Sequence, residues 1–365
     1  LLRAGMTLAL RSVLAERALQ LVQIHSAIGH EAAIADHVEA WAHQHYPPEE
    51  VVRVSHSLVL GRRVDPRPTI ALVGHLDTVP AHPEGNPPRI EGDRLFGLGS
   101  SDMKGALAVM MALAEALPRD TLPVNLLLVF YEREEGPFQE SGLGPLFERV
   151  PELNGLRFAI AMEPTDGAVQ VGCVGTLHAT LRFQGQAAHS ARPWQGKNAI
   201  HAAGPLLAEL AARERTPVIV EGHTFYEVMS ATLAKGGRAR NVVADSFELN
   251  VNYRFAPGKP VAQAQADVFA FVGGRCEVTF VDLAPSGKLC GGNPWFQALE
   301  KLSGRPAEAK QAWTDVARFS ELGVDAVNFG PGETAQAHQH GESASVSALR
   351  HAFDTLQSLL TAPVR

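Results

Sequence analysis

The sequence predicts an α/β protein in which a mostly parallel sheet carries helices on both faces and a second, ferredoxin-like domain is inserted. From residue 1 to about 175, apolar strand-like segments alternate with helical segments, which is typical of a parallel sheet covered on both sides. From 176 to 287 the expected order changes to βαββαβ, the split motif of ferredoxin-like folds. Helices and one strand return after Pro285, so residues 1–175 and 288–365 are expected to form one domain and residues 176–287 the inserted one.

Three expected strands of the first domain each lead to a side chain that can bind a metal ion. TIALVG leads to His75, and RFAIAM leads to Glu163. VNLLLVFY leads to the adjacent acids Glu134 and Glu135. Because ligands of open α/β sheets bind beyond the carboxyl ends of the strands, this recurrence predicts a site at that edge.

The stretch from Asp102 to Pro118 is expected to be a helix. Its apolar residues recur every three or four positions, and Pro118 ends the pattern. Asp102 is the candidate N-cap, which places its carboxylate at the beginning of the helix.

The inserted domain alternates short strands and helices. Phe247, Leu249, Val251 and Tyr253 share one face of a strand, so this sheet should have one covered face and one freer face. The four expected strands are 177–185, 227–237, 245–255 and 276–284, and the two helices begin near residues 197 and 262. The returning segment is expected to form helices at 295–302, 316–322 and 348–360 and a strand at 326–330.

Composition narrows the classes of partner. The net charge is −7 and no dense Lys/Arg cluster is present, which argues against nucleic acid and anionic membranes and favours a small-molecule substrate. No run of about 18 apolar residues exists to span a membrane. The N-terminal segment has an amphipathic rhythm without the features of a signal peptide, and the odd count of three cysteines suits a reducing compartment. The cytoplasm is therefore the expected location.

Imidazoles and carboxylates without thiolates suit Zn²⁺ or a similar first-row dication. Asp77, two residues after His75, is better cast as a group that orients the histidine ring than as a ligand. Alternate side chains of a strand face opposite ways, so we expect one of Glu134 and Glu135 to bind metal and the other to transfer protons. The full set of candidates is His75, Asp77, Asp102, Glu134, Glu135, Glu163, and His338 or His340.

Five segments carry a resemblance that covers essentially the whole chain. GHLDTVP, GLGSSDMKGALA, YEREEGP, MEPTD and GPGETAQAHQHGE occur in the order and spacing of the M20 family of co-catalytic metallohydrolases. GQAAHSARPWQGKNAI and ARNVVADSFELNVNYRFAPG extend the similarity through the middle domain. Within the family, which includes acetylornithine deacetylases and carboxypeptidases, the chain is most similar to the succinyl-diaminopimelate desuccinylases of actinobacterial type.

The resemblance implies a zinc-hydrolase-type catalytic domain with two divalent metal ions, Zn²⁺ or Co²⁺. It places His75 and Glu163 on one metal, Glu135 and His338 on the other, and Asp102 between them. His338 is preferred to His340 because it stands four residues before Glu342, as the closing histidine of the family does.

The same resemblance assigns the remaining roles. Glu134 falls on the general base, with Asp77 beside it, and His189 falls on a histidine of the lid that reaches the neighbouring subunit of a homodimer. Asn241, Arg254 and Thr314 match positions that contact substrate. From the residues alone, His189 is better explained as a hydrogen-bonded loop histidine, and a surface salt bridge explains Arg254 equally well.

The implied reaction is removal of succinate from N-succinyl-L,L-2,6-diaminopimelate, a step towards lysine and cell-wall precursors. Two alternatives stay open from the sequence. One is a related hydrolase of acetylated amino acids or dipeptides. The other is a catalytically silent metal-binding scaffold, which the intact Glu134 disfavours.

Overall fold

The computed structural model describes the backbone of residues 2–362 and the side chains of residues 10–362. The chain divides into two compact units. The first unit contains the chain up to Gly172, Leu289–Glu308 and the chain from Thr314 onward, and the second unit contains Cys173–Lys288 and Ala309–Trp313. The segment 309–313 belongs with the second unit because the Gln311 side chain binds one of its strands, accepting the Tyr226 N–H at 3.1 Å and donating to the Thr224 oxygen at 2.9 Å.

The first unit is built on an eight-stranded sheet. In spatial order its strands are β1 (Val51–Val54), β2 (Ser57–Leu60), β6 (Asn125–Tyr131), β3 (Thr69–His75), β7 (Phe158–Ala161), β15 (Ala326–Asn328), β8 (Gln170–Val171) and β14 (Glu308–Ala309). The four central strands, β6 to β15, are parallel, whereas β1, β2 and β8 pair antiparallel with their neighbours. His75 pairs with Tyr131, and Val73 pairs with Ala161, so the carboxyl ends of the three site-bearing strands lie at one edge.

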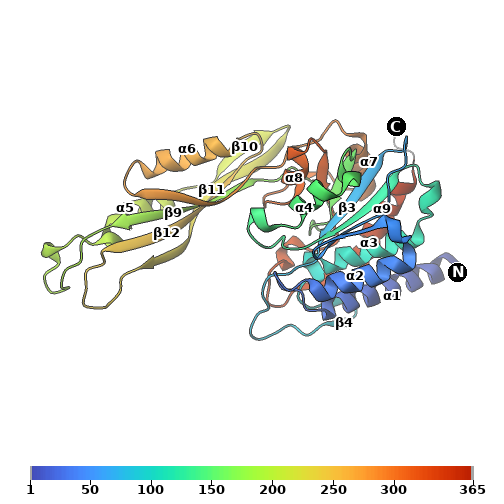
Figure 1. Cartoon of the computed structure of the whole chain (residues 1–365), viewed down its shortest axis with the longest axis horizontal. Coiled ribbons are helices and arrows are strands. Elements are labelled where there is room, and N and C mark those ends of the chain that lie inside the picture. The colour runs from blue at the N-terminus through green and yellow to red at the C-terminus, as the bar shows by residue number, and fades with distance from the viewer. Residues whose placement is uncertain (1, 363–365) are drawn as a thin grey trace. The chain divides into compact units, whose positions relative to one another are not determined.

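Helices cover both faces of this sheet (Figure 1). One face packs against α1 (Leu2–Gln23), α2 (Ala32–His45), α3 (Gly105–Ala116), α7 (Pro294–Ser303) and α9 (Val346–Thr361). The other face carries α4 (Leu143–Arg149) and α8 (Val316–Glu321), which contact the outer strands β1 and β2 and the inner strands β7 and β15 respectively. Among the described residues, no helix has the length and apolar character needed to cross a bilayer.

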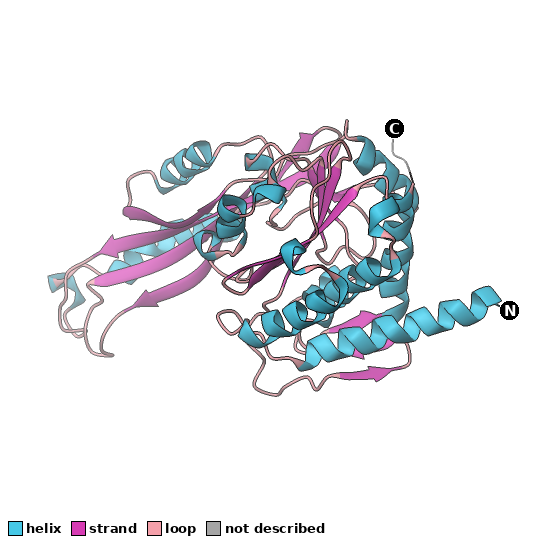
Figure 2. Ribbon diagram, turned by 45° about the vertical axis from the view of Figure 1, so that its right-hand side comes forward, coloured by secondary structure: helices cyan, strands magenta, loops and turns pink. Residues whose placement is uncertain are grey.

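Strands buried on both faces explain the continuous apolar runs of the sequence. Every residue of β3 and β6 is buried. Ile70 and Leu72 belong to the core shared with α1, α3 and α9, while their neighbours Ala71 and Val73 face the other side. A small sheet, β16 (Ser343–Ser345), β5 (Arg94–Phe96) and β4 (Arg89–Glu91), packs beside α1 (Figure 2).

The expected helix from Asp102 begins later than the sequence suggested. A distorted turn, η2 (Ser100–Lys104), precedes α3, and Asp102 has non-helical φ and ψ of −124° and 91°. The residue that precedes α3 is Lys104, and its side chain makes no capping hydrogen bond. The prediction of Asp102 as N-cap is therefore wrong, because its carboxylate faces the imidazole of His75 instead of the helix.

The second unit is a five-stranded antiparallel sheet with helices on one face. Its strands in spatial order are β10 (Thr216–Val220), β11 (His223–Gly236), β12 (Ser246–Phe255), β9 (Gly175–Gln184) and β13 (Glu277–Ala284), and its helices are α5 (Ala199–Ala212) and α6 (Val261–Val272). Without β10 this is the ferredoxin-like order expected from βαββαβ. The sequence missed β10 because Pro217 lies within it, and a strand that contains proline is tolerated only at an edge.

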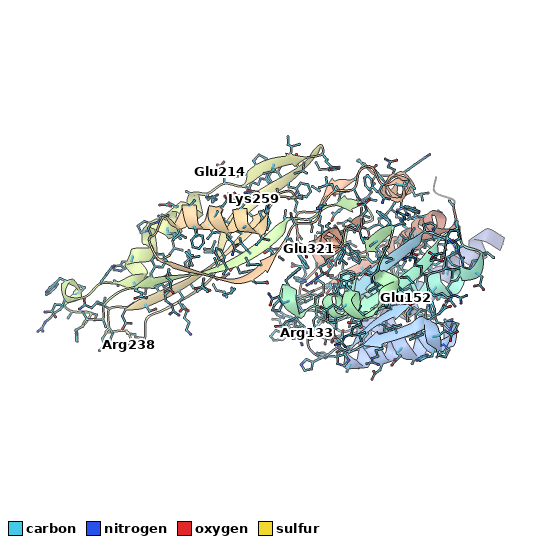
Figure 3. The ribbon with its side chains drawn as sticks, turned by 45° about the horizontal axis from the view of Figure 1, so that its top comes forward. Arg133, Glu152, Glu214, Arg238, Lys259 and Glu321 are labelled. Atoms are coloured by element: carbon cyan, nitrogen blue, oxygen red, sulfur yellow. The ribbon has the colours of Figure 1, made fainter. Side chains whose placement is uncertain are left out.

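The core of this unit lies between the sheet and its two helices. Leu249, Val251 and Tyr253 face α5 and α6, as the alternation predicts. Lys259, labelled in Figure 3, donates to Glu227 and Asp267, both at 2.7 Å. This ion-pair network ties β11 to α6.

Candidate metal centre

The carboxyl ends of β3, β6 and β7 are held together by backbone hydrogen bonds beyond the strands themselves. The Leu76 N–H donates to Tyr131 O at 2.7 Å, and the Met162 N–H donates to Val73 O at 2.8 Å. These bonds continue the pairing past the last strand residues. His75 and the loops that carry the acidic residues therefore start from one rigid edge.

The Asp102 carboxylate lies between two histidines. Its Oδ1 is 3.0 Å from His75 Nε2, and its Oδ2 is 3.6 Å from His338 Nε2. One carboxylate thus presents a different oxygen to each imidazole. This is the arrangement required of a group that bridges two metal ions.

Glu135 completes the second half of this arrangement. Its Oε1 is 2.9 Å from His338 Nε2. His75, Asp102 and Glu135 each offer one ligand atom, and these atoms lie within 4.8 Å of one another. Glu163, buried at the end of β7, stands outside this trio, but its charge raises the pKa of Glu134 and so places it nearby.

Asp77 performs a different task from the one expected. The backbone oxygen of Asp77, not its carboxylate, makes the shorter contact with the His75 ring, at 3.0 Å from Nδ1 against 3.6 Å for Oδ1. With Nδ1–H donating to this oxygen, Nε2 keeps its lone pair for a ligand. The Asp77 carboxylate instead accepts the N–H groups of Glu134 and Glu135, at 3.0 and 2.9 Å, and fixes the backbone of the acidic pair.

Strand alternation does not separate Glu134 from Glu135, because neither residue lies in a strand. Strand β6 ends at Tyr131, and Arg133 has a left-handed φ of 63°, so the pair lies in a turn. Their separation comes from this turn: the Glu135 carboxylate faces His338, whereas that of Glu134 is absent from the converging trio. The side chain of Arg133, labelled in Figure 3, pairs with Glu140 and makes no contact with the acidic pair.

Two glycines allow a second loop to cross the site closely. A Cβ on Gly330 would lie 2.3 Å from Met162 O, and a Cβ on Gly332 would lie 2.1 Å from Ser101 O. Side chains there would collide with the backbone beside Glu163 and Asp102. The GPG motif therefore lets the loop towards His338 pass against both ligand-bearing segments.

Glu342 fixes the turn that holds Asp102. Its carboxylate accepts three backbone N–H groups, from Gly99 and Ser101 at 2.8 Å and from Asp102 at 2.9 Å. Burial raises the pKa of Glu342 to about 7 against the effect of these bonds. Lys104 lies buried nearby, with its Nζ donating to Ile24 O at 2.7 Å, and burial lowers its pKa to about 8.

Negative charge is concentrated at this edge. Burial raises the pKa of Glu134 well above its usual value, and the carboxylates of Glu163 and Glu135 add to the effect. Burial also raises the pKa of Asp77. The hydrogen bond to Glu135 raises the pKa of His338 to about 9. Five acids against two imidazoles form a site that favours bound cations.

The structure places the remaining candidate residues as follows. His340 does not join the centre and lies instead with His82 and Glu84. In the second unit, His189 forms a bridge with Val242, and the Ser190 N–H donates to Asn241 O at 2.9 Å, so the His189 and Asn241 segments run side by side.

His189 makes the loop hydrogen bond that the residues alone suggested. It is exposed, and its Nδ1 accepts the Ala191 N–H at 3.1 Å. Arg254 lies on the face of β12 opposite the core, with its Nε donating to Asn252 at 2.8 Å. Thr314 belongs to the first unit and is buried.

Sequence reasoning missed a buried network next to the site. The Tyr131 hydroxyl donates to Asp315 Oδ2 at 2.5 Å, and Arg318 Nε donates to Asp315 Oδ1 at 2.6 Å. The Tyr131 ring lies edge-on to His75, with centroids 6.3 Å apart. The only hint of this network in the sequence is that Arg318 follows Asp315 by three residues at the start of a short helix. This spacing is too common to predict a buried ion pair.

The donor set fits divalent metal ions. The converging atoms are imidazole nitrogens and carboxylate oxygens, and the second imidazole, His338, approaches the other carboxylate oxygen of Asp102. Such a set suits Zn²⁺ and neighbouring first-row dications better than Ca²⁺ or Mg²⁺, which prefer all-oxygen sites. The residues present are therefore chemically suited to a metal pair.

Comparisons with known proteins agree with this geometry. Residues 71–362 match the model of peptidase family M20/M25/M40. A protein of Mycobacterium tuberculosis strain H37Rv, provisionally named succinyl-diaminopimelate desuccinylase DapE, is 39% identical over 343 residues, which cover 93% of this chain and 96% of that protein. A succinyl-diaminopimelate desuccinylase of Corynebacterium glutamicum is 34% identical over 349 residues, with 94% of each chain covered.

Solved structures share the fold at low sequence identity. A tripeptidase of Staphylococcus aureus superposes with a TM-score of 0.76 at 21% identity, covering 96% of this chain and 98% of that one. An M20 metallo-carboxypeptidase of Sulfolobus solfataricus gives 0.76 at 16% identity, covering 94% and 97%. The matched family model, the close relatives and the cluster of histidines and acids agree: the chain belongs to peptidase family M20/M25/M40 and is a metal-dependent amidohydrolase.

Proposed function

We propose that this enzyme hydrolyses N-succinyl-L,L-2,6-diaminopimelate to succinate and L,L-diaminopimelate, a step towards lysine and cell-wall precursors. The observation that carries the hydrolytic part is the Asp102 carboxylate, which offers one oxygen to His75 and the other to His338. The substrate is supported by the names of relatives that match along nearly their whole length.

The proposed cofactor is a pair of divalent ions, Zn²⁺ or Co²⁺. His75 and Glu163 would hold one ion, Glu135 and His338 would hold the other, and Asp102 would be shared. Asp77 would act on both halves, since its backbone oxygen orients His75 and its carboxylate fixes the backbone of Glu135. When bound, such a pair supplies polarisation of an amide carbonyl and acidification of a water molecule.

Glu134 is the proposed proton shuttle. Its backbone is anchored by Asp77, and its half-buried carboxylate is close enough to Glu163 and Glu135 for their charges to raise its pKa. As water adds to the amide carbon, Glu134 takes one of its protons. It then delivers this proton to the leaving nitrogen, so that the products are a carboxylate and an amine.

The second unit is proposed to complete the substrate site. Arg254 offers a planar guanidinium that suits two-point binding of a carboxylate, and the substrate carries several carboxylates. Asn241 and Thr314 would add neutral donors. His189 would stabilise the oxyanion and would act on the neighbouring subunit of a homodimer that forms through the second unit. Its exposure is compatible with a role across an interface.

Activity assays on one preparation of the purified enzyme test the proposal. Chelation should abolish activity, and Zn²⁺ or Co²⁺ should restore it. The restored enzyme should turn over N-succinyl-L,L-diaminopimelate with a far higher kcat/KM than N-acetylornithine. Preference for the acetylated substrate would reject the proposed substrate while leaving the metal-dependent amidohydrolase intact.

A further inference from the structure

A second cluster of metal-binding side chains lies on the surface of the first unit. It consists of His82, Glu84 and His340, and each offers a ligand atom within 4.8 Å of the other two. His340 Nε2 is 3.3 Å from Glu84 Oε2, and the rings of His82 and His340 have centroids 4.3 Å apart. All three residues are exposed to solvent.

This cluster joins two loops that are remote in sequence but fixed to each other. Asn86, in the loop of His82 and Glu84, donates from Nδ2 to Glu342 O at 2.8 Å. The loop of His340 is anchored in turn because the Glu342 carboxylate accepts three backbone N–H groups. The three side chains are therefore brought together by the backbone and need little rearrangement to act together.

We propose that His82, Glu84 and His340 form a third metal site, specific for Zn²⁺ and similar first-row dications and separate from the catalytic pair. Two imidazole nitrogens and one carboxylate oxygen form a donor set that Zn²⁺ accepts, with the remaining coordination position filled by water. The site is solvent-exposed, so it should bind more weakly than the buried ligands around Asp102 and exchange its ion faster.

One local hydrogen bond sets a condition for binding. His82 Nδ1 accepts the Glu84 N–H at 3.2 Å, which leaves the ring proton of neutral His82 on Nε2. A metal ion must therefore either bind Nδ1 in place of this amide, or bind Nε2 after the ring proton moves to Nδ1, and both routes end the hydrogen bond from the Glu84 N–H.

An ion at this position would cross-link the two loops. The first loop follows the segment of Asp77, and the second lies between His338 and Glu342. Binding should therefore protect residues 79–88 from backbone hydrogen exchange without any change in the catalytic residues. This readout is independent of activity.

The test is zinc stoichiometry at equal, buffered free Zn²⁺, measured by dialysis and elemental analysis on the full chain. We expect the wild type to bind one more ion per chain than the double variant His82→Ala/His340→Ala. The double variant His43→Ala/His201→Ala, which removes two exposed histidines outside the cluster, should bind as many ions as the wild type. Equal zinc content in the wild type and the His82/His340 variant would overturn the proposal.

Measurements in a second variant, Asp102→Ala, test the surface site independently of the proposed function. In Asp102→Ala, which disrupts the buried centre, Zn²⁺ should still slow exchange in residues 79–88. Addition of His82→Ala and His340→Ala to that background should remove the effect. Protection that survives the triple change would show that the ion binds elsewhere and that His340 and Glu84 form an ordinary surface ion pair.

Discussion

Glu342 holds the backbone of Asp102 through a hydrogen bond of 2.9 Å from the Asp102 N–H to Glu342 Oε1. The same carboxylate accepts two further N–H groups from the turn before α3. A residue that is not among the proposed ligands thus fixes the backbone of Asp102, the carboxylate proposed to be shared by the two ions.

Glu342→Gln should weaken metal binding through this turn. The amide offers one acceptor oxygen, so at least one of the three N–H groups would face an NH₂ group and lose its partner. We expect zinc affinity to fall about 10- to 100-fold, as is typical when groups that orient ligands are lost, and stability to fall by about 1–3 kcal/mol. Isothermal titration and thermal unfolding check both. Glu333→Gln is the control. It removes a loop acid that pairs with Arg94 of β5, and it should leave zinc affinity unchanged.

Glu134→Gln and Glu135→Gln should separate the roles of the two adjacent acids. The first should remove nearly all turnover while metal content stays equal to that of the wild type, because Glu134 lies outside the trio of converging ligand atoms. The second should lose metal, because Glu135 contacts His338 at 2.9 Å. Elemental analysis of both variants decides the matter, and loss of metal from Glu134→Gln alone would reverse the assignment.

A homodimer with His189 acting across the interface predicts complementation. Glu134→Gln and His189→Ala chains, each inactive, should regain activity when mixed, because some heterodimers would carry one intact composite site. Subunit exchange is followed in parallel by fluorescence energy transfer between labelled chains. Proven exchange without recovered turnover would place His189 in its own site or outside catalysis.

Arg254→Lys should distinguish the carboxylates of the substrate. If the guanidinium binds the succinyl carboxylate, the variant should lose about 2–5 kcal/mol of transition-state stabilisation with the succinylated substrate, measured as the fall in kcat/KM. The loss with an acetylated substrate should be much smaller. Arg182→Lys is the matched control, since Arg182 lies on the same sheet and pairs with Glu248. Equal losses on both substrates would mean that Arg254 binds a group common to the two.

The Asp93 carboxylate should stabilise the fold at neutral pH and lose this effect in acid. Burial would raise its pKa, but hydrogen bonds from Ser347 and Ser345 and the charge of Arg11 outweigh burial and lower it. A carboxyl whose native pKa is below its unfolded value of about 4 stabilises the fold above that pH and loses this contribution as the pH falls through the native pKa.

Asp93→Asn should therefore lower the melting temperature at pH 7, by the equivalent of about 1 kcal/mol for partly exposed, charged hydrogen bonds at the start of α9. The difference from wild type should shrink as the pH drops from about 5 to 2. Asp36→Asn, which removes a more exposed acid paired with Arg53, should give a smaller difference at pH 7. A constant deficit across that range would rule out the charge of Asp93 as its source.

The sequence was sufficient where one local pattern determines one local structure. The apolar runs before His75, Glu134 and Glu163 predicted buried strands, and the structure places these strands side by side with their carboxyl ends aligned. The resemblance to a family chose His338 over His340, a choice that no pattern of polarity makes among the 15 histidines.

The errors arose where a tertiary contact replaces a local one. Asp102 has the position of an N-cap, but His75 takes its carboxylate. Asp77 was expected to hold the His75 ring by its side chain, yet two backbone N–H groups from a turn 57 and 58 residues away bind that carboxylate. The sequence near Asp102 does not show that His75 will contact its carboxylate, and the sequence near Asp77 does not show that the N–H groups of Glu134 and Glu135 will bind there.

The position of β15 has a consequence for synthesis of the chain. This strand pairs with β7 on one side and β8 on the other, yet its residues are made after the whole second unit. While the ribosome makes the intervening segment, the sheet lacks β15, and the edges of β7 and β8 that it will cover remain open to incorrect pairing. His338 emerges only ten residues after Asn328, so closure of the sheet and completion of the ligand set are nearly the same event. A nascent chain therefore completes the proposed ligand set only after the last strand of the large sheet, β15, has been made.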